Sequence, residues 1–86
     1  MTAEGMVFPC RFPIKAMGEN AADLEALVLA IVRQHVADEQ ILSHQTRPSR
    51  AGKYCSVTVT IEAESQHQLD RIYGALTAES RILMAL

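Results

Sequence analysis

The sequence lacks tryptophan and holds only two tyrosines and two phenylalanines among its 86 residues. The core must therefore be aliphatic, and few rings are left on which nucleic-acid bases would stack. A basic surplus is absent as well, since eight Lys and Arg stand against ten Asp and Glu, a formal net charge of −2. Because nucleic acids and anionic membranes attract basic surfaces, we expect neither as a partner.

Cysteine is scarce too. Cys10 and Cys55 are too few for a disulfide framework. Residues 1–6 contain no basic segment and no long apolar run, so we expect neither a signal peptide nor a membrane span. These absences favour a cytoplasmic protein with reduced thiols.

No arrangement typical of an enzyme or a metal site is present. There is no Ser-His-Asp or Cys-His pattern with a usable context, and no glycine pattern of a phosphate loop. The three histidines, His35, His44 and His67, lack the spacing of metal ligands. We therefore expect no catalysis, no metal and no cofactor.

The composition that remains is that of a globular protein, with 49% hydrophobic and 21% charged residues. Residues 1–6 are expected to form a flexible tail, and residues 7–86 to form one domain.

The first half of the chain predicts a strand, a helix and a second strand. Apolar residues alternate from 12 to 16, and this strand ends at Gly18. A helical stripe follows over residues 21–36, with Asn20 as its N-cap. Residues 41–48 read as a polar edge strand because the closing proline cannot donate a hydrogen bond.

The second half predicts a strand, a helix and a last strand. Residues 53–63 alternate strictly between an apolar and a polar face. Ser65 and Gln68 match a capping box before an amphipathic helix at residues 66–78. The apolar ending, residues 81–86, predicts a short strand.

The order β-α-β-β-α-β indicates an α+β fold, the ferredoxin-like sandwich. Right-handed crossovers place both helices on one face of a four-stranded antiparallel sheet, with the first and third strands central. This topology brings the corner after the first strand beside the turn between the second and third strands. It therefore brings together a candidate ligand-binding set: Gly18, Glu19, Asn20, Arg47, Arg50 and Lys53.

Two interpretations of this set stay open. Free amides at the start of the first helix, together with basic side chains, are typical of an anion site. Alternatively, the hairpin is simply solvated, and its charges keep a sheet edge from aggregating.

Three residues are candidates for an interface. Leu29 extends the apolar arc of the first helix sideways, which predicts either a covering loop or a contact with a second subunit. Tyr54 and Thr58 lie on the open face of the sheet. RNA-binding relatives of this architecture stack bases on that face, but one aromatic ring there is a weak platform.

The chain resembles the YbeD-like family, small bacterial proteins grouped under a domain of unknown function. The segments "FPCRFPIKAMG", "RPSRAGKYCSVTVTIEAES", "QLDRIYGAL" and "RILMAL" carry this resemblance, which covers about residues 8–86. It implies the same ferredoxin-like fold and a similarity to ACT domains, which bind amino acids or other small effectors and regulate enzymes, commonly as dimers. ACT domains often hold the ligand at a glycine-containing turn, which residues 17–20 occupy here. The resemblance also implies an association with lipoate metabolism through neighbouring genes.

Together these inferences predict a non-catalytic ACT-like regulatory module. It would bind a small anionic or amino-acid effector, or a partner enzyme, and form a weak homodimer. The alternative is a ligand-free protein-interaction adaptor, with a link to lipoate metabolism.

Overall fold

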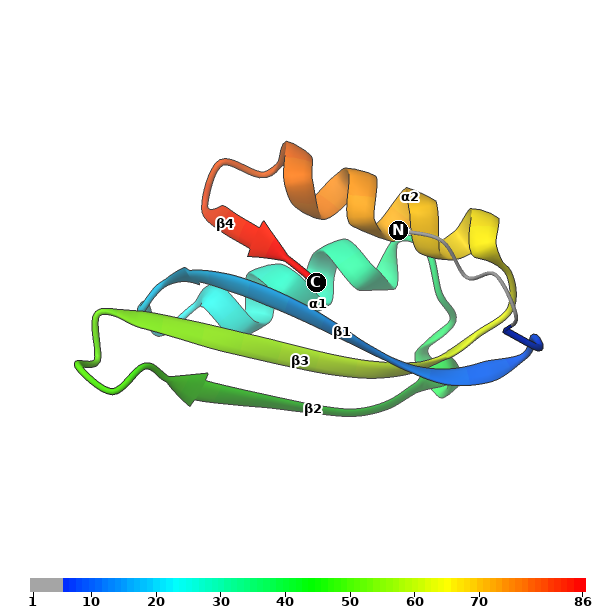
Figure 1. Ribbon diagram of the computed structural model, residues 1–86, viewed down its shortest axis with the longest axis horizontal. Coiled ribbons are helices and arrows are strands. Elements are labelled where there is room, and N and C mark those ends of the chain that lie inside the picture. The colour runs from blue at the N-terminus through cyan, green and yellow to red at the C-terminus, as the bar shows by residue number, and fades with distance from the viewer. Residues whose placement is uncertain (1–5) are drawn as a thin grey trace.

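Four strands form one antiparallel sheet in the order β2-β3-β1-β4, and both helices cover the same face (Figure 1). The computed structural model describes residues 6–86, so most of the predicted tail lies outside the described residues. The elements are β1 (Cys10–Glu19), α1 (Leu24–Arg33), a short 3₁₀ helix (Asp38–Gln40), β2 (Ile41–Pro48), β3 (Tyr54–Ala63), α2 (Gln66–Ala78) and β4 (Ile82–Ala85). The predicted ferredoxin-like sandwich is confirmed, with β1 and β3 at its centre.

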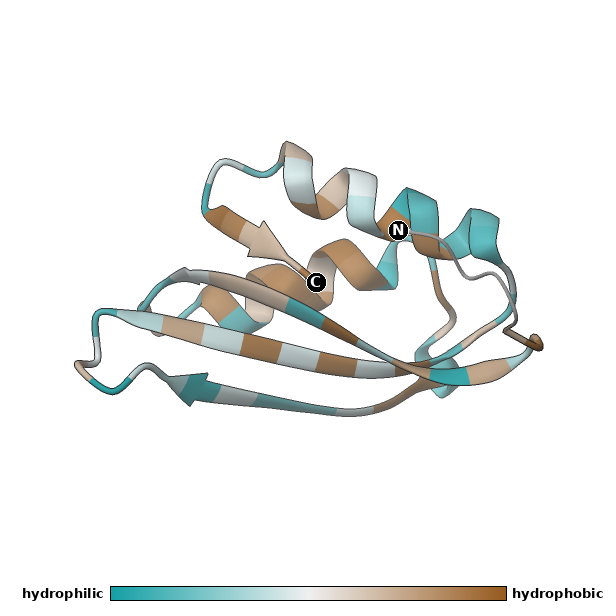
Figure 2. Cartoon of the chain, in the orientation of Figure 1, coloured by the Kyte–Doolittle hydropathy of each residue, from teal (hydrophilic) through white to brown (hydrophobic). Residues whose placement is uncertain are grey.

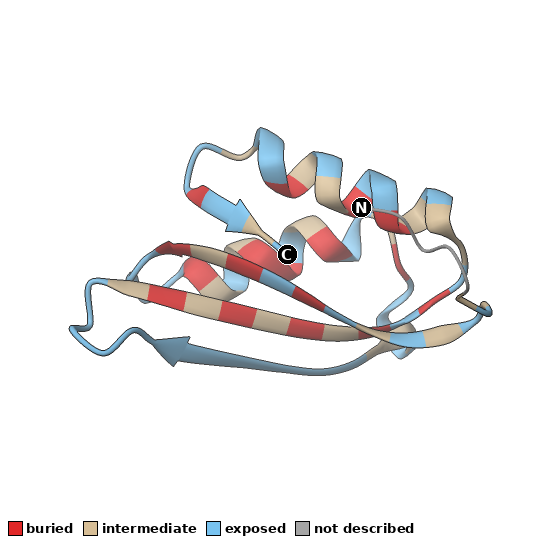
Figure 3. Ribbon diagram, viewed as in Figure 1, coloured by how far each residue is buried: buried red, intermediate tan, exposed pale blue. Residues whose placement is uncertain are grey.

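Strand β3 carries the alternation that the sequence predicts. Its apolar residues face the helices and are at most 2% exposed: Cys55, Val57, Val59, Ile61 and Ala63. Figure 2 shows hydrophobic positions alternating with polar ones along β3, and Figure 3 shows the same alternation in burial. Within residues 6–86, no helix lies over the opposite face of the sheet (Figure 1), and we call this face the open face.

Helix α1 is shorter than predicted at both ends. It runs from Leu24 to Arg33, and Asn20 is not its N-cap. The reason is a contact that is remote in sequence: the Asn20 side-chain amide donates to the Gly52 carbonyl at 2.9 Å. Asn20 is thereby held against the hairpin, and residues 21–23 form a turn before the helix begins.

Leu29 lies in the core of its own chain. It is 6% exposed and belongs to the same buried cluster as Val28 and Val32. This burial favours the alternative that Leu29 is covered within its own chain, and a subunit contact at Leu29 stays a prediction.

Helix α2 has the predicted bounds, Gln66–Ala78, and the predicted cap. The Ser65 hydroxyl accepts a hydrogen bond from the Gln68 amide at 3.1 Å. The second half of the capping box is absent, because the Gln68 side chain bonds the Glu64 amide at 2.8 Å and the His35 carbonyl at 3.0 Å instead. These bonds tie the start of α2 to the end of α1.

Candidate anion-binding site on the open face of the sheet

The corner after β1 and the β2–β3 hairpin meet at one end of the molecule, as the topology predicts. The Asn20 amide donates to the Lys53 carbonyl at 2.9 Å, beside the side-chain bond to Gly52. The segment between α2 and β4 reaches the same end. A Cβ on Gly18 would lie 2.6 Å from the Arg81 carbonyl oxygen.

Most polar groups of this corner already have partners within the chain. Gly18 is buried, and the Asn20 side chain is bonded to the hairpin. The Arg81 guanidinium bonds both carboxylate oxygens of Asp23 at the start of α1, at 2.6 and 3.0 Å. These bonds hold the pKa of Asp23 below its ordinary value and place a negative charge where the helix dipole favours one.

The predicted residues are therefore close in space, but they do not line one common cavity. Glu19 and Asn20 line a cavity that faces Arg81 and Leu83 on the β4 side. Arg50 and Lys53 are exposed on the hairpin, where the Lys53 ammonium lies 5.4 Å from the centre of the Tyr54 ring. A ligand-binding role for Gly18, Glu19, Asn20, Arg50 and Lys53 stays a prediction.

Arg47 belongs to a different surface, the open face. On β2, His44 and Thr46 face the helices, because their side chains reach Glu25 on α1 at 3.5 and 2.6 Å. Successive side chains of a strand point to opposite faces, so Gln45 and Arg47 project from the open face.

The strand register arranges the open face in two rows across the sheet. One row runs Lys15, Thr58, Gln45, and the next runs Met17, Ser56, Arg47. Lys15 and Arg47 stand on the two strands that flank β3. Their backbones are about 12 Å apart, because two strand spacings of about 4.8 Å separate them sideways and two residues of about 3.3 Å separate them along the strands. Both side chains are long enough to reach inward over β3.

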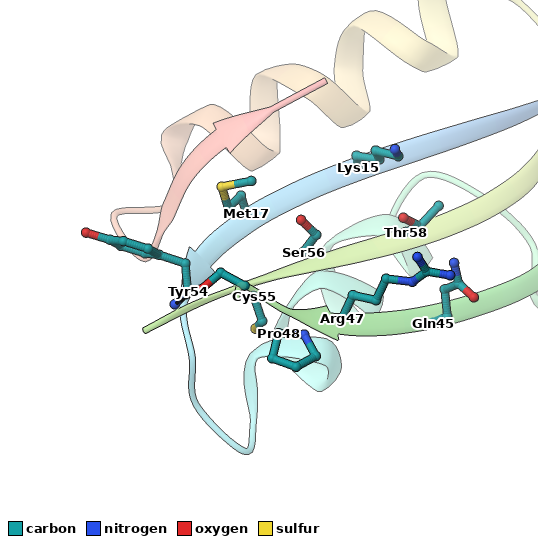
Figure 4. Close-up of a pocket in the computed structure, with 10 residues that line it drawn as sticks. Lys15, Met17, Gln45, Arg47, Pro48, Tyr54, Cys55, Ser56 and Thr58 are labelled. Carbon is teal, nitrogen blue, oxygen red and sulfur yellow. Dashed lines mark hydrogen bonds between the residues drawn. The ribbon is translucent and has the colours of Figure 1, made fainter. Parts of the chain in front are cut away.

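These rows line a cavity of about 440 Å³. Figure 4 shows Lys15 above β3, Arg47 below it, and Ser56 and Thr58 between them. The lining residues are Lys15, Met17, Gln45, Arg47, Pro48, Ser49, Tyr54, Cys55, Ser56 and Thr58.

The cavity is electropositive in a chain whose net charge is negative. It is lined by two cations and no acidic side chain, and all its lining residues fall within the described part of the chain. Neither Lys15 nor Arg47 forms an ion pair with any of residues 6–86. The hydroxyls of Ser56 and Thr58 add hydrogen-bond donors between the two charges, so the arrangement is chemically suited to an anion.

Sequence reasoning found part of this site. It named Arg47 as a ligand residue, and Tyr54 and Thr58 as open-face residues, but it missed Lys15. The signal was available, because the alternation of residues 12–16 puts Lys15 on the polar side of its strand. Only the register shows that Lys15 and Arg47 flank the same stretch of β3.

Among residues 6–86, no cluster of three or more His, Cys, Asp or Glu side chains is arranged to hold a metal ion. In the same part of the chain, no helix is both long enough and apolar enough to cross a membrane.

The fold and the cavity define a small ferredoxin-like domain with a candidate ligand site on its sheet. A family model described as a protein of unknown function (DUF493) matches residues 3–86. The chain therefore belongs to the DUF493 family, which confirms the resemblance seen in the sequence.

The chain is similar to bacterial proteins named UPF0250. The one from Neisseria gonorrhoeae is 44% identical over 79 residues, covering 92% of this chain and 87% of that protein. NE1487 from Nitrosomonas europaea is 40% identical and covers 100% of both chains. Two solved structures, each 13% identical, share the fold. HP0495 from H. pylori has a TM-score of 0.65 and covers 100% of this chain and 94% of its own. The uncharacterized protein TM1266 from Thermotoga maritima has a TM-score of 0.63 and covers 88% of this chain and 92% of its own.

Proposed function

We propose that this protein is a non-catalytic regulatory module that binds a small anionic effector on the open face of its sheet. The observation that carries the proposal is the cavity over β3, where Lys15 and Arg47 have no ion-pair partner among residues 6–86 and no acidic side chain lies between them. An anion placed there would be held by two charge-assisted hydrogen bonds and by the hydroxyls of Ser56 and Thr58.

Binding at this place would act on the sheet as a whole. The ligand would join β1 to β2 across β3, and β2 is one of the two edge strands of the described sheet. A regulatory effect follows if the ligand has different affinities for two arrangements of a partner enzyme or of a weak homodimer. Light scattering with and without ligand tests the homodimer: we expect a ligand-dependent shift in mass, whereas a strict monomer at millimolar concentration would contradict it.

Calorimetric titration with butyrate tests the binding site. Hydrogen bonds to charged groups contribute about 1.5–3 kcal/mol each, so Lys15→Gln or Arg47→Gln should each weaken binding by about tenfold or more. Binding should also weaken as salt is added, because the two cations are exposed to solvent.

The matched controls are Arg50→Gln and Lys53→Gln. They remove the same charge from the neighbouring hairpin, and neither residue lines the cavity. We expect them to bind butyrate as the unmodified protein does. If they abolish binding while Lys15→Gln and Arg47→Gln do not, the anion site is the corner predicted from the sequence instead.

A second candidate, a ligand-free adaptor, is favoured by strand β2. Among residues 6–86, this strand is paired only with β3, and seven of its eight residues are exposed. Figure 3 shows this exposure along the length of β2. An unpaired edge of this kind accepts an extended peptide as an additional strand. Cross-linking in the native cells distinguishes the two proposed functions. It would also capture any partner protein that belongs to lipoate metabolism. An adaptor should keep its partner when Lys15 and Arg47 are both replaced by Gln, and a ligand-dependent regulator should not.

A further inference from the structure

A second cavity continues the first one across the open face towards β4. It has a volume of about 140 Å³ and shares Lys15, Met17 and Ser56 with the first cavity. Its other walls include Met84 on β4 and Leu86 just after it. The shared residues place the two cavities side by side on the open face. We call the two cavities together the groove, and it extends from the hydroxyls and cations over β3 to the apolar side chains at β4.

The apolar end of the groove is exposed and is formed by neighbouring residues of two strands. Met84 and Leu86 are 50% and 59% exposed. Met84 pairs with Met17 across the sheet, and the Leu86 backbone pairs with Lys15 through bonds of 3.0 and 2.8 Å. The sheet register therefore fixes an apolar surface next to the Lys15 side chain. Methionine side chains are flexible and adapt to aliphatic groups.

Among residues 6–86, the groove has no acidic side chain in its lining that would neutralise a positive charge on a ligand. The strand alternation assigns two acids to this face, Glu19 and Glu62. They lie at the two ends of the β1–β3 pair, where Glu19 is opposite Tyr54 and Glu62 is opposite Arg11. An ammonium group would lose its hydration here without gaining a carboxylate partner, so the groove disfavours a zwitterionic amino acid.

We propose that the effector is an amphipathic monoanion, with its anionic group between Lys15 and Arg47 and an aliphatic chain lying over Met17, Met84 and Leu86. This inference rests on the proposed function and adds the chemical class of the ligand. The two cations hold the anionic group of the ligand, and the apolar end of the groove binds longer aliphatic chains more tightly.

The test is a titration of the full chain with acetate, butyrate and hexanoate, followed through the amide signals of Ser56 and Thr58. Each methylene that the groove buries strengthens binding by up to about fourfold, which corresponds to ~0.8 kcal/mol. We therefore expect affinity to rise from acetate to hexanoate, and hexylamine, with the same chain and the opposite charge, to bind far more weakly.

The matched pair of variants is Met84→Gln and Leu83→Gln. Leu83 is its neighbour on β4 and is 59% exposed, but it lines the cavity on the Glu19 side instead of this groove. Met84→Gln should flatten the dependence on chain length and Leu83→Gln should preserve it. Both positions are exposed, so both variants should fold, which the dispersion of the amide spectrum checks.

The outcomes separate this inference from the proposed function. Equal affinity for all three acids, still lost with Lys15→Gln and Arg47→Gln, overturns the amphipathic ligand and leaves the anion site intact. No binding of any acid overturns both. Equal binding of hexylamine and hexanoate, or an unchanged chain-length dependence in Met84→Gln, also overturns the inference.

Discussion

Replacing Gly18 by alanine should destabilise the protein because the backbone of a neighbouring segment occupies the space of the new methyl group. A Cβ at Gly18 would lie 2.6 Å from the Arg81 carbonyl oxygen and 3.2 and 3.3 Å from two methyl carbons of Leu24. The side chain of Leu24 can adjust slightly, but a backbone oxygen at 2.6 Å requires the segment before β4 to move. Gly18 does not have a positive φ, so its requirement is close approach and not backbone conformation.

The magnitude follows from two opposing effects. Overpacking typically costs about 1–3 kcal/mol. The opposing effect is that alanine lowers the conformational entropy of the unfolded chain, which stabilises the folded protein by about 0.4–1 kcal/mol. The net expectation for Gly18→Ala is a loss of about 1–2 kcal/mol in the free energy of unfolding, or a fall in Tm of about 4–16 °C for a domain of this size.

Gly74→Ala is the matched control. Gly74 lies in α2, and apart from its chain neighbours and the backbone of its own helix, nothing lies within 4 Å of the position that its Cβ would take. Alanine favours an exposed helix by about 0.8–1 kcal/mol over glycine, so the same chemical change should stabilise the protein here. Urea denaturation with unchanged m-values measures both effects. A Gly18→Ala protein as stable as the unmodified one would refute the argument from close approach.

Three other substitutions test separate contacts. Gly52 has φ +75° in the hairpin, so Gly52→Ala should cost about 1–2 kcal/mol of stability in urea although the space around it is open. Thr46→Val should raise the pKa of Glu25 in an NMR titration, because the Thr46 hydroxyl bond is the largest cause of its depression below 4.5. A carboxyl group whose pKa is lower in the folded than in the unfolded protein stabilises the fold at pH values above its unfolded pKa. This stabilisation is lost as the pH falls through the folded pKa, so Thr46→Val should lose less stability than the unmodified protein below about pH 5. Tyr73→Phe removes the 2.6 Å bond from the phenol to the Leu86 carbonyl and should cost about 1 kcal/mol, and no change in urea would contradict the role of that bond.

Periodicity alone predicts the elements whose signals are local. Strand β3 alternates strictly, and α2 follows a serine that caps it, so both were found with bounds within a residue of those observed. Helix α1 was predicted too long because Asn20 looks like an N-cap in the sequence. Its amide is instead bonded to a carbonyl 32 residues away, and no local pattern reveals that partner.

The residues of the candidate site were likewise only partly predictable from the sequence. Arg47 was found because it lies in a conspicuous basic segment, whereas Lys15 lies between apolar residues, Ile14 and Ala16, and was not identified. The close approach of the Arg81 backbone to Gly18 was also not predictable from the sequence. In both cases the missing information is which strands are adjacent and in what register, and that is a property of the folded sheet.

The most direct test of the central claim is an amide chemical-shift map of the full chain titrated with hexanoate. The proposed site predicts that the largest shifts fall at Lys15, Arg47, Ser56 and Thr58, and that they disappear when Lys15 and Arg47 are both replaced by Gln. Shifts confined to residues 18–20 and 50–53, or an unchanged spectrum at millimolar hexanoate, would contradict it.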